Sequence, residues 1–189
     1  NKAPGYCYTR VGNPTVTAFE NRITKLEGGM ASIACASGMA AIMNAILNIV
    51  RSGDEIVSSA SLYGGSIDLF RDIEEFGIKT RYVKNNDWEA IEGAINEHTR
   101  LLFAETIGNP CLDVTDVERL AEIAHAHKIP LILDNTTATA YLFQGLKHGA
   151  DIVVNSSSKY INGSSNSISG ILTLSLIHIS EPTRQAEIS

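Results

Sequence analysis

The sequence PLILDNT, at positions 130–136, joins a short apolar run to an abrupt group of polar residues. An apolar run of this length without polar alternation is typical of a strand covered on both faces of a parallel sheet. A second run, DIVV at 151–154, leads in the same way to SSSK at 156–159. Ligands of parallel α/β sheets bind beyond the carboxyl ends of the strands. Asp134 and Lys159 are therefore expected at one functional edge.

Apolar runs alternate with amphipathic segments along the rest of the chain. Between Pro14 and the pair Gly28-Gly29, apolar residues recur at three- and four-residue spacing, which predicts a helix that begins near 14 and ends before 28. The same reasoning predicts further helices at 39–50, 65–76, 87–96 and 114–127, and strands at 32–35, 55–58, 79–83, 101–104, 130–133 and 151–154. Such alternation predicts an α/β fold with a mostly parallel sheet flanked by helices.

Composition excludes several classes of protein. With 189 residues, 44% hydrophobic and 19% charged, the chain suits one globular domain. Its net charge of -6 offers no basic surface for nucleic acid. No apolar run approaches the roughly 20 residues that span a bilayer, and the first residues lack a secretory signal. We therefore expect a cytoplasmic protein with no nucleic-acid partner and no membrane segment.

The three cysteines, Cys7, Cys35 and Cys111, are far apart and show no C-x-x-C spacing. This pattern supports neither a disulfide framework nor a metal site, so we expect reduced thiols that serve in packing.

The two ends of the chain differ from the middle. The sequence lacks an initiator Met and starts with an arm, 1–13, before the domain expected at 14–173. The strand–helix rhythm is lost in 174–189, which resembles the translation of a sequencing adapter and is expected to be a non-native tail. A genuine strand followed by a tail is the alternative. With a non-native tail, the natural protein would continue beyond about Thr173 and this domain would be incomplete.

Lysine and aspartate at one sheet edge suit a particular chemistry. Pyridoxal phosphate (PLP) needs a lysine that binds its aldehyde, a carboxylate that keeps its ring nitrogen protonated, and donors for its phosphate. Lys159, Asp134 and the helix that follows Ser37-Gly38 could supply these groups. Taken singly, each feature has a plain alternative, because most lysines are solvated and an aspartate after a strand often caps a turn. The hypothesis depends on their coincidence.

Longer motifs carry a family resemblance from residue 8 to residue 172. They read YTRVGNPT at 8–15, ASGMAA at 36–41, LYGG at 62–65, ETIGNP at 105–110, DNT at 134–136 and SSSKYING at 156–163. In order and spacing this series resembles the PLP-dependent trans-sulfuration enzymes of cysteine and methionine metabolism. The resemblance implies PLP as cofactor and the large domain of the fold type I PLP-dependent transferases.

The resemblance also assigns roles to single residues. Lys159 resembles the Schiff-base lysine, which also moves protons during catalysis, and Tyr63 resembles a ring-stacking tyrosine that acts as acid or base. Asp134 would face the pyridine nitrogen, and Asn109 would contact the ring hydroxyl with Glu105 nearby. The groups expected around the phosphate are Ser37, the amides of Gly38 and Met39, and the hydroxyls of Ser156 and Ser158.

Two residues of the arm are expected to act across a subunit boundary. In the family that the chain resembles, the counterparts of Tyr8 and Arg10 reach the phosphate of the neighbouring subunit, and the fixed donor fork of arginine suits that contact. Without the resemblance, an arginine in a loop would simply be solvated. The resemblance thus implies a homo-oligomer, a dimer with shared sites that commonly assembles into a tetramer.

The reaction is less constrained than the cofactor. Gly163-Ser164-Ser165-Asn166 replaces the family's usual Gly-His motifs, and Ala140 stands where proline is common. With the serine run at 156–158, this variant looks most like O-acetylhomoserine sulfhydrylases, which replace acetate at the γ-carbon of a small amino-acid substrate with sulfide or a thiol, giving homocysteine or methionine. Open alternatives are γ-elimination by a methionine or cystathionine gamma-lyase, and cystathionine gamma-synthase.

Two hypotheses from other classes are also considered. The family's C-terminal domain carries the arginine that grips the substrate carboxylate; without that domain, the chain would be an inactive cofactor-binding fragment. A nucleotide-binding Rossmann domain is disfavoured because no G-x-G-x-x-G follows the first strand.

Overall fold

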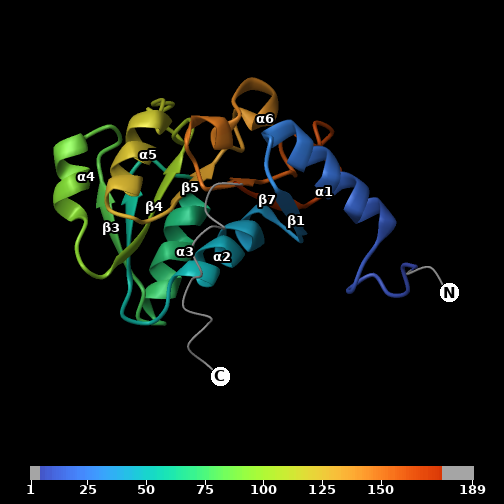
Figure 1. Ribbon diagram of the computed structural model, residues 1–189, viewed down its shortest axis with the longest axis horizontal. Coiled ribbons are helices and arrows are strands. Elements are labelled where there is room, and N and C mark those ends of the chain that lie inside the picture. Colours follow the sequence, from blue (N-terminus) through green and yellow to red (C-terminus); the bar gives the residue numbers. More distant parts are fainter. Residues whose placement is uncertain (1–4, 176–189) are drawn as a thin grey trace.

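A computed structural model describes residues 5–175, which form one mixed sheet with helices on both faces (Figure 1). The helices are α1 (Pro14–Glu27), α2 (Gly38–Ile49), α3 (Gly64–Glu74), α4 (Trp88–Ala94), α5 (Val117–Ala126), α6 (Thr139–Leu142) and the 3-10 helix η1 (Gly145–His148). The strands are β1 (Ala31–Cys35), β2 (Glu55–Ser59), β3 (Lys79–Val83), β4 (Thr99–Glu105), β5 (Leu131–Asp134), β6 (Ile152–Asn155) and β7 (Gly170–Leu174).

Most strand pairs are parallel, as the alternation predicts. Within the described residues the order across the sheet is β1-β7-β6-β5-β4-β2-β3. The neighbours from β6 through β3 all run parallel, whereas β7 is antiparallel to both β1 and β6. The parallel strands bring the residues after β4, β5 and β6 to the same edge. The expected α/β class with a mostly parallel sheet is confirmed.

Both faces of the central strands are covered by apolar cores. Leu131, Ile132 and Leu133 of β5 are all fully buried. Ile132 belongs to the core under α2 and α3, where Phe70 and Phe103 meet edge to face with ring centroids 5.0 Å apart. The other two leucines belong to the core under α5. This double burial explains why the apolar run of β5 shows no alternation.

Several local expectations are corrected by tertiary contacts. The apolar stripe predicted for α1 is wrong in part, because Val16 and Leu26 are 39% exposed while Glu27 is fully buried. The helix predicted from 114 begins at Val117, because the side chain of Asp116 caps it by accepting from the Arg119 amide. The short helices α6 and η1, between β5 and β6, are not predicted, because four residues are too few to show the helical spacing of apolar residues.

The cysteines are free thiols, but packing explains only part of their placement. Cys35 is partly buried against the core of α2 and α3. Cys7 and Cys111 are exposed, so the expected packing role is wrong for these two.

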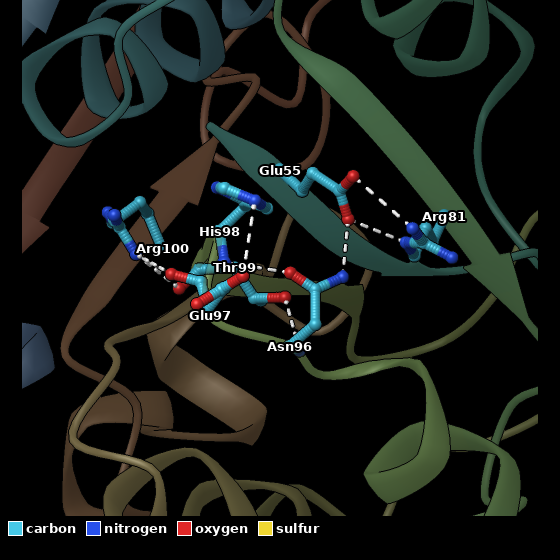
Figure 2. Close-up of polar contacts among 7 residues, drawn as sticks. All are labelled: Glu55, Arg81, Asn96, Glu97, His98, Thr99 and Arg100. Carbon is cyan, nitrogen blue, oxygen red and sulfur yellow. Dashed lines mark hydrogen bonds and ion pairs between the residues drawn. The ribbon is translucent and has the colours of Figure 1, made fainter. Parts of the chain in front are cut away.

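A buried carboxylate joins strands at the edge opposite the polar strand ends (Figure 2). Glu55, the first residue of β2, accepts hydrogen bonds from Arg81 Nε at 2.6 Å and from Asn96 Nδ2 at 2.7 Å. These contacts tie β3 and the loop before β4 to β2. The guanidinium of Arg81 and the amide of Asn96 lower the pKa of Glu55 to about 2.

The described part of the chain contains no helix that is long and apolar enough to cross a membrane. In the same residues, no cluster of His, Cys, Asp and Glu is suited to a metal ion. The boundary expected after Thr173 falls inside β7, since Leu174 still pairs with Ala31 and with Ile152. Residues 1–4 and 176–189, which include most of the expected tail, lie outside the described residues.

Candidate active site

The carboxyl ends of β5 and β6 are joined by a relay of hydrogen bonds. Asp134, the last residue of β5, accepts at Oδ1 from the amide of Thr136 at 2.9 Å and from its hydroxyl at 2.6 Å. The Thr136 hydroxyl accepts in turn from the Ser156 amide at 2.8 Å. The Ser156 carbonyl then accepts from the Lys159 amide at 3.0 Å. Asp134 and the turn that carries Lys159 are therefore parts of one rigid polar structure.

Asp134 is a buried acid at the end of β5. It is 9% exposed, and burial raises the pKa of its carboxyl, while the two hydrogen bonds from Thr136 lower it. A carboxyl in such surroundings is stabilised as an anion by a nearby positive charge. The site is thus suited to a cationic partner next to Asp134.

The N-terminus of α2 packs directly against the end of β6. A Cβ at Gly38 would lie 2.6 Å from Ser156 Cβ and 2.8 Å from its hydroxyl, so only glycine fits here. The hydroxyl of Ser37 caps the helix by accepting from the Ala40 amide at 3.1 Å. The first amides of α2, those of Gly38 and Met39, have no partner within the helix, and the Ser156 hydroxyl lies beside them. Amides and a hydroxyl at a helix N-terminus make a cradle for an anion.

The two serines expected at the phosphate differ in their contacts. The Ser158 hydroxyl donates to the Ser169 carbonyl at 3.0 Å and accepts from the Ser169 amide at 2.9 Å. Its single proton is therefore committed to the segment before β7. The hydroxyl of Ser156 lies beside Gly38 and is the better placed of the two to donate to an anion.

A second buried carboxylate, Glu105 at the end of β4, holds two backbone segments. Its Oε1 accepts from the Tyr63 amide at 2.7 Å, and the Asn109 backbone also hydrogen-bonds to it. Burial, with a smaller contribution from the negative charge of Asp134, raises the pKa of Glu105 to about 7, although the hydrogen bonds from the two backbones oppose the rise. The structure thus places Glu105 as a support for the loops of Tyr63 and Asn109. The sequence had suggested only that it lies near the ring.

Tyr63 presents its ring to solvent at the start of α3. The residue is 52% exposed, so Tyr63 is not a packed core tyrosine. The ring lies over Gly65, where an added Cβ would come within 2.5 Å of the ring edge. The glycine therefore makes room for the tyrosine ring itself, which is left with one face open.

Lys159 is exposed in the turn after β6. Its carbonyl accepts from the Gly163 amide at 2.8 Å, and this bond closes a turn over residues 160–162. An exposed amine at a rigid position is accessible to a ligand at this edge.

Tyr8 and Arg10 are not brought to these residues by their own chain. The guanidinium of Arg10 lies 5.7 Å from the centroid of the Tyr8 ring, and both side chains are exposed. The arm that carries them extends away from the sheet beyond the start of α1 (Figure 1).

Thr136 is the functional residue that residue-by-residue reasoning missed. Its hydroxyl joins Asp134 to Ser156, the two strand ends on which the cofactor hypothesis depends. The available signal was the D-x-T spacing, because a hydroxyl two residues after an aspartate commonly closes a turn onto it.

These donors fit the three ends of PLP. The amides of α2 and the Ser156 hydroxyl suit the phosphate, the buried Asp134 suits the ring nitrogen, and the Lys159 amine suits the aldehyde. Because Gly38 has no Cβ, its backbone lies close to Ser156, which places the first amides of α2 next to the Ser156 hydroxyl.

Sequence comparisons agree with this chemistry. A family model described as the PLP-dependent enzymes of cysteine and methionine metabolism matches residues 1–187. The O-acetyl-L-homoserine sulfhydrylase of Leptospira meyeri is 47% identical over 169 residues, covering 89% of this chain and 38% of that protein. An L-methionine gamma-lyase of Fusobacterium nucleatum is 41% identical over 170 residues, covering 89% of this chain and 43% of that protein.

The fold has a close match among solved structures. An O-acetylhomoserine (thiol)-lyase from Campylobacter jejuni, which contains a pyridoxyl-lysine monophosphate, superposes with a TM-score of 0.87 at 38% identity. The match covers 92% of this chain and 43% of that structure. The chain thus spans about two fifths of the length of the proteins it matches.

Proposed function

The chain belongs to the family of PLP-dependent enzymes of cysteine and methionine metabolism, and from that premise we propose that it holds the cofactor of an enzyme that replaces the acetate of O-acetyl-L-homoserine with sulfide or a thiol. The observation that carries this proposal is the relay from Asp134 through Thr136 and Ser156 to Lys159, with the cradle at Gly38 beside it.

Each of the chain's own groups has a distinct task in this proposal. Bound PLP supplies an electron-withdrawing ring that takes up the negative charge left when a proton leaves the substrate. Asp134 keeps the ring nitrogen protonated by placing a carboxylate beside it. The amides of Gly38 and Met39, with the hydroxyls of Ser37 and Ser156, hold the phosphate. Ser158 acts by fixing the turn through Ser169.

Lys159 and Tyr63 carry the proton transfers. Lys159 would hold the cofactor through its side-chain amine, and the same amine would move protons at the substrate α-carbon. Tyr63 stacks its open face on the ring and serves as acid or base at the leaving group. Asn109 contacts the ring hydroxyl, and Glu105 holds the backbones of both Tyr63 and Asn109.

The position of the arm supports completion of the site by a second copy. Tyr8 and Arg10 are exposed and lie beyond the start of α1, where they are free to reach the phosphate of a neighbouring subunit. We propose a cytoplasmic homo-oligomer with shared sites, a dimer that pairs into a tetramer, acting on a small amino-acid substrate. Three free thiols in the described chain agree with a reducing compartment.

γ-Elimination is the second candidate reaction. It is supported by the 41% identity to a methionine gamma-lyase. The same groups of the site could serve both reactions, because replacement and elimination share the early proton transfers and the same cofactor. They separate only when a sulfur nucleophile adds to the substrate.

Cofactor attachment can be tested on the 189-residue chain. After incubation with PLP and reduction with borohydride, peptide mass spectrometry should find the pyridoxyl group on Lys159. A Lys159→Ala variant should lose the cofactor absorbance, whereas Lys84→Ala, which removes an exposed lysine after β3, should keep it. Equal labelling of Lys84 and Lys159 would overturn the assignment.

The reaction can be tested with O-acetyl-L-homoserine. Homocysteine that forms only when sulfide is present supports replacement. Release of a 2-oxo acid and ammonia without sulfide supports elimination. A chain that binds PLP at Lys159 and turns over neither way would support a cofactor-binding fragment and contradict the enzymatic proposal for this chain alone.

A further inference from the structure

Two polar side chains close to the strand ends of the candidate site are fully buried, and none of the oxygen and nitrogen atoms of these side chains has a hydrogen-bond partner in the part of the chain that the structure describes. Glu27, the last residue of α1, is 0% exposed, and Asn155, the last residue of β6, is 1% exposed. Among the described residues, neither oxygen of Glu27 and neither amide atom of Asn155 has a hydrogen-bond partner. Four orphaned polar atoms in a packed interior are costly, because each has lost its water without gaining a replacement.

The surroundings of Glu27 leave Asn155 as its natural partner. The side chains of Asn135 and Asn155 and the backbone of Gly145 lie near enough to lower the pKa of Glu27. The amide of Asn135 already donates one hydrogen to the Phe143 carbonyl at 2.7 Å and accepts at its oxygen from the Thr106 hydroxyl at 2.8 Å, so it can offer Glu27 only its second amide hydrogen. The amide of Asn155 is not engaged in the described chain.

We propose that Glu27 is a neutral carboxylic acid that pairs with the amide of Asn155 and acts as a positioning residue for the strand end that leads to Ser156 and Lys159. In this pair the carboxyl O–H donates to Oδ1 of Asn155, and Nδ2 of Asn155 donates to the other carboxyl oxygen. Two hydrogen bonds then satisfy all four orphaned atoms at once. An ionised Glu27 could accept only one of them and would leave Oδ1 unpaired.

The electrostatics of the interior agree with a neutral acid. Burial raises the pKa of Glu27 to about 7, and the nearby side chains of Asn135 and Asn155 and the backbone of Gly145 oppose this rise only in part. Of the segments packed against α1, which are β1, β7, α6 and η1, only η1 carries groups that can be charged near neutral pH, Lys147 and His148, and the last turn of α1 itself carries Lys25. None of them is among the causes of the shift, so no cation compensates a carboxylate here.

The pair connects the helix after the arm to the catalytic turn. Asn155 directly precedes Ser156, whose amide is held by Thr136 and whose carbonyl holds the Lys159 amide. A strand end pinned from below by Glu27 keeps Ser156 against Gly38. This last consequence rests on the proposed PLP site, whereas the pairing itself does not.

Infrared spectroscopy of the full chain without cofactor tests the protonation state directly. At about pH 6, between the ordinary pKa of a glutamate and its raised value here, wild type should show a protonated-carboxyl band that is missing from a Glu27→Gln variant. The difference between the two spectra isolates Glu27 from Glu105, whose pKa is also about 7. The exposed Glu92→Gln should remove no such band. A Glu27→Gln spectrum with an undiminished band would overturn the proposal.

A double-mutant cycle tests the partner. Glu27→Leu and Asn155→Leu should each lower the midpoint of thermal unfolding, and the double variant should lose clearly less than the sum, because each single change leaves the other group unpaired. Strictly additive losses would refute the pairing. The amide of a Glu27→Gln variant can form the same two hydrogen bonds, so its midpoint of thermal unfolding should be close to that of wild type. This variant still tests the pairing if the leucine variants do not fold.

PLP retention tests the positioning role. Glu27→Gln should retain PLP as wild type does, whereas Glu27→Leu should bind it several-fold more weakly in equilibrium dialysis although Lys159 is intact. Equal retention by Glu27→Leu would contradict the positioning role. If wild type itself binds no PLP, the proposed function fails, while the infrared and unfolding results still decide the pairing.

Discussion

At the scale of single residues, Gly38 shapes the candidate site because glycine has no side chain. The absence of a Cβ lets the start of α2 meet Ser156 and brings helix amides to a strand end. The same residue both packs the fold and opens the anion cradle.

A methyl group at position 38 should therefore damage both stability and cofactor binding. Gly38→Ala places a Cβ 2.6 Å from Ser156 Cβ and 2.9 Å from its backbone, so we expect a loss of about 1–3 kcal/mol in unfolding free energy together with weaker PLP retention. Gly93→Ala in α4 is the matched control. Its Cβ would meet nothing within 4 Å, and a gain of about 0.5–1 kcal/mol is expected from helix propensity. Denaturant unfolding of both variants measures the contrast; equal behaviour would contradict it.

Glu105 should act through the backbones that it holds. Glu105→Leu removes the acceptor for the Tyr63 amide, which should cost about 1–3 kcal/mol and weaken PLP binding. Glu105→Gln keeps an acceptor for the Tyr63 amide, so its loss of stability and of PLP binding should be smaller.

The protonation of Glu105 should also make stability depend on pH. The folded pKa of about 7 lies above the ordinary value of 4.5, so the folded state holds the proton more tightly and stability falls as pH rises from about 4.5 to about 7. Thermal unfolding across this range should show a shallower fall in Glu105→Gln than in wild type. A steeper fall in the variant would refute the sign.

At the scale of elements, the two edges of the sheet have different tasks. The carboxyl ends of β4, β5 and β6 carry the candidate site, while the opposite edge is joined by Glu55, Arg81 and Asn96 (Figure 2). The polar network of that edge connects strands that are far apart in sequence and leaves the site edge open to ligands.

Loss of the Glu55 network should reduce stability in a pH-dependent way. The folded pKa of Glu55, about 2, lies below its ordinary value of 4.5, so its contribution is present above about pH 4.5 and is lost as pH falls toward about 2. At neutral pH Glu55→Gln should lower the unfolding free energy by about 1–3 kcal/mol, since charge-assisted hydrogen bonds to a buried group are removed. Glu97→Gln, whose side chain is 89% exposed, should change it by less than about 0.5 kcal/mol. Acid titration of unfolding compares the two; similar effects would contradict the network's role.

At the scale of the whole molecule, stability should decrease from the centre of the sheet toward its edges. The strands β4 and β5 lie inside the sheet, and all four residues of β5 are buried, whereas β3 at one edge has no buried residue. The site edge is therefore built on the best-protected strands.

Hydrogen exchange should reproduce this gradient. We expect the slowest amide exchange in β4 and β5, at residues such as Phe103 and Leu133, and the fastest strand exchange in β3. The arm that carries Tyr8 and Arg10 should exchange faster still, because its side chains are exposed and it extends away from the sheet. Residue-resolved exchange measured by mass spectrometry checks the order. Protection of the arm in the oligomer would be added evidence for its contact with a neighbouring subunit, whereas slow exchange in β3 would contradict the gradient.

The sequence by itself determined the order of most helices and strands and which polar residues follow the strands. Hydrophobic periodicity and the Pro and Gly residues that bound α1 are local signals, so most elements lie close to their predicted positions. The polar residues after β5 and β6 are local signals too. For this reason Asp134 and Lys159 could be named before their surroundings were known.

Only the tertiary structure decided how these pieces meet. The antiparallel entry of β7 between β1 and β6, the contact of Gly38 with Ser156, and the burial of Glu27 all join residues that are distant in sequence. Local patterns cannot encode such contacts, because whether a polar side chain is solvated or buried depends on which segment packs against it. The sequence pattern around Glu27 is the same whether its side chain faces water or Asn155. Packing against the sheet decides which of the two occurs.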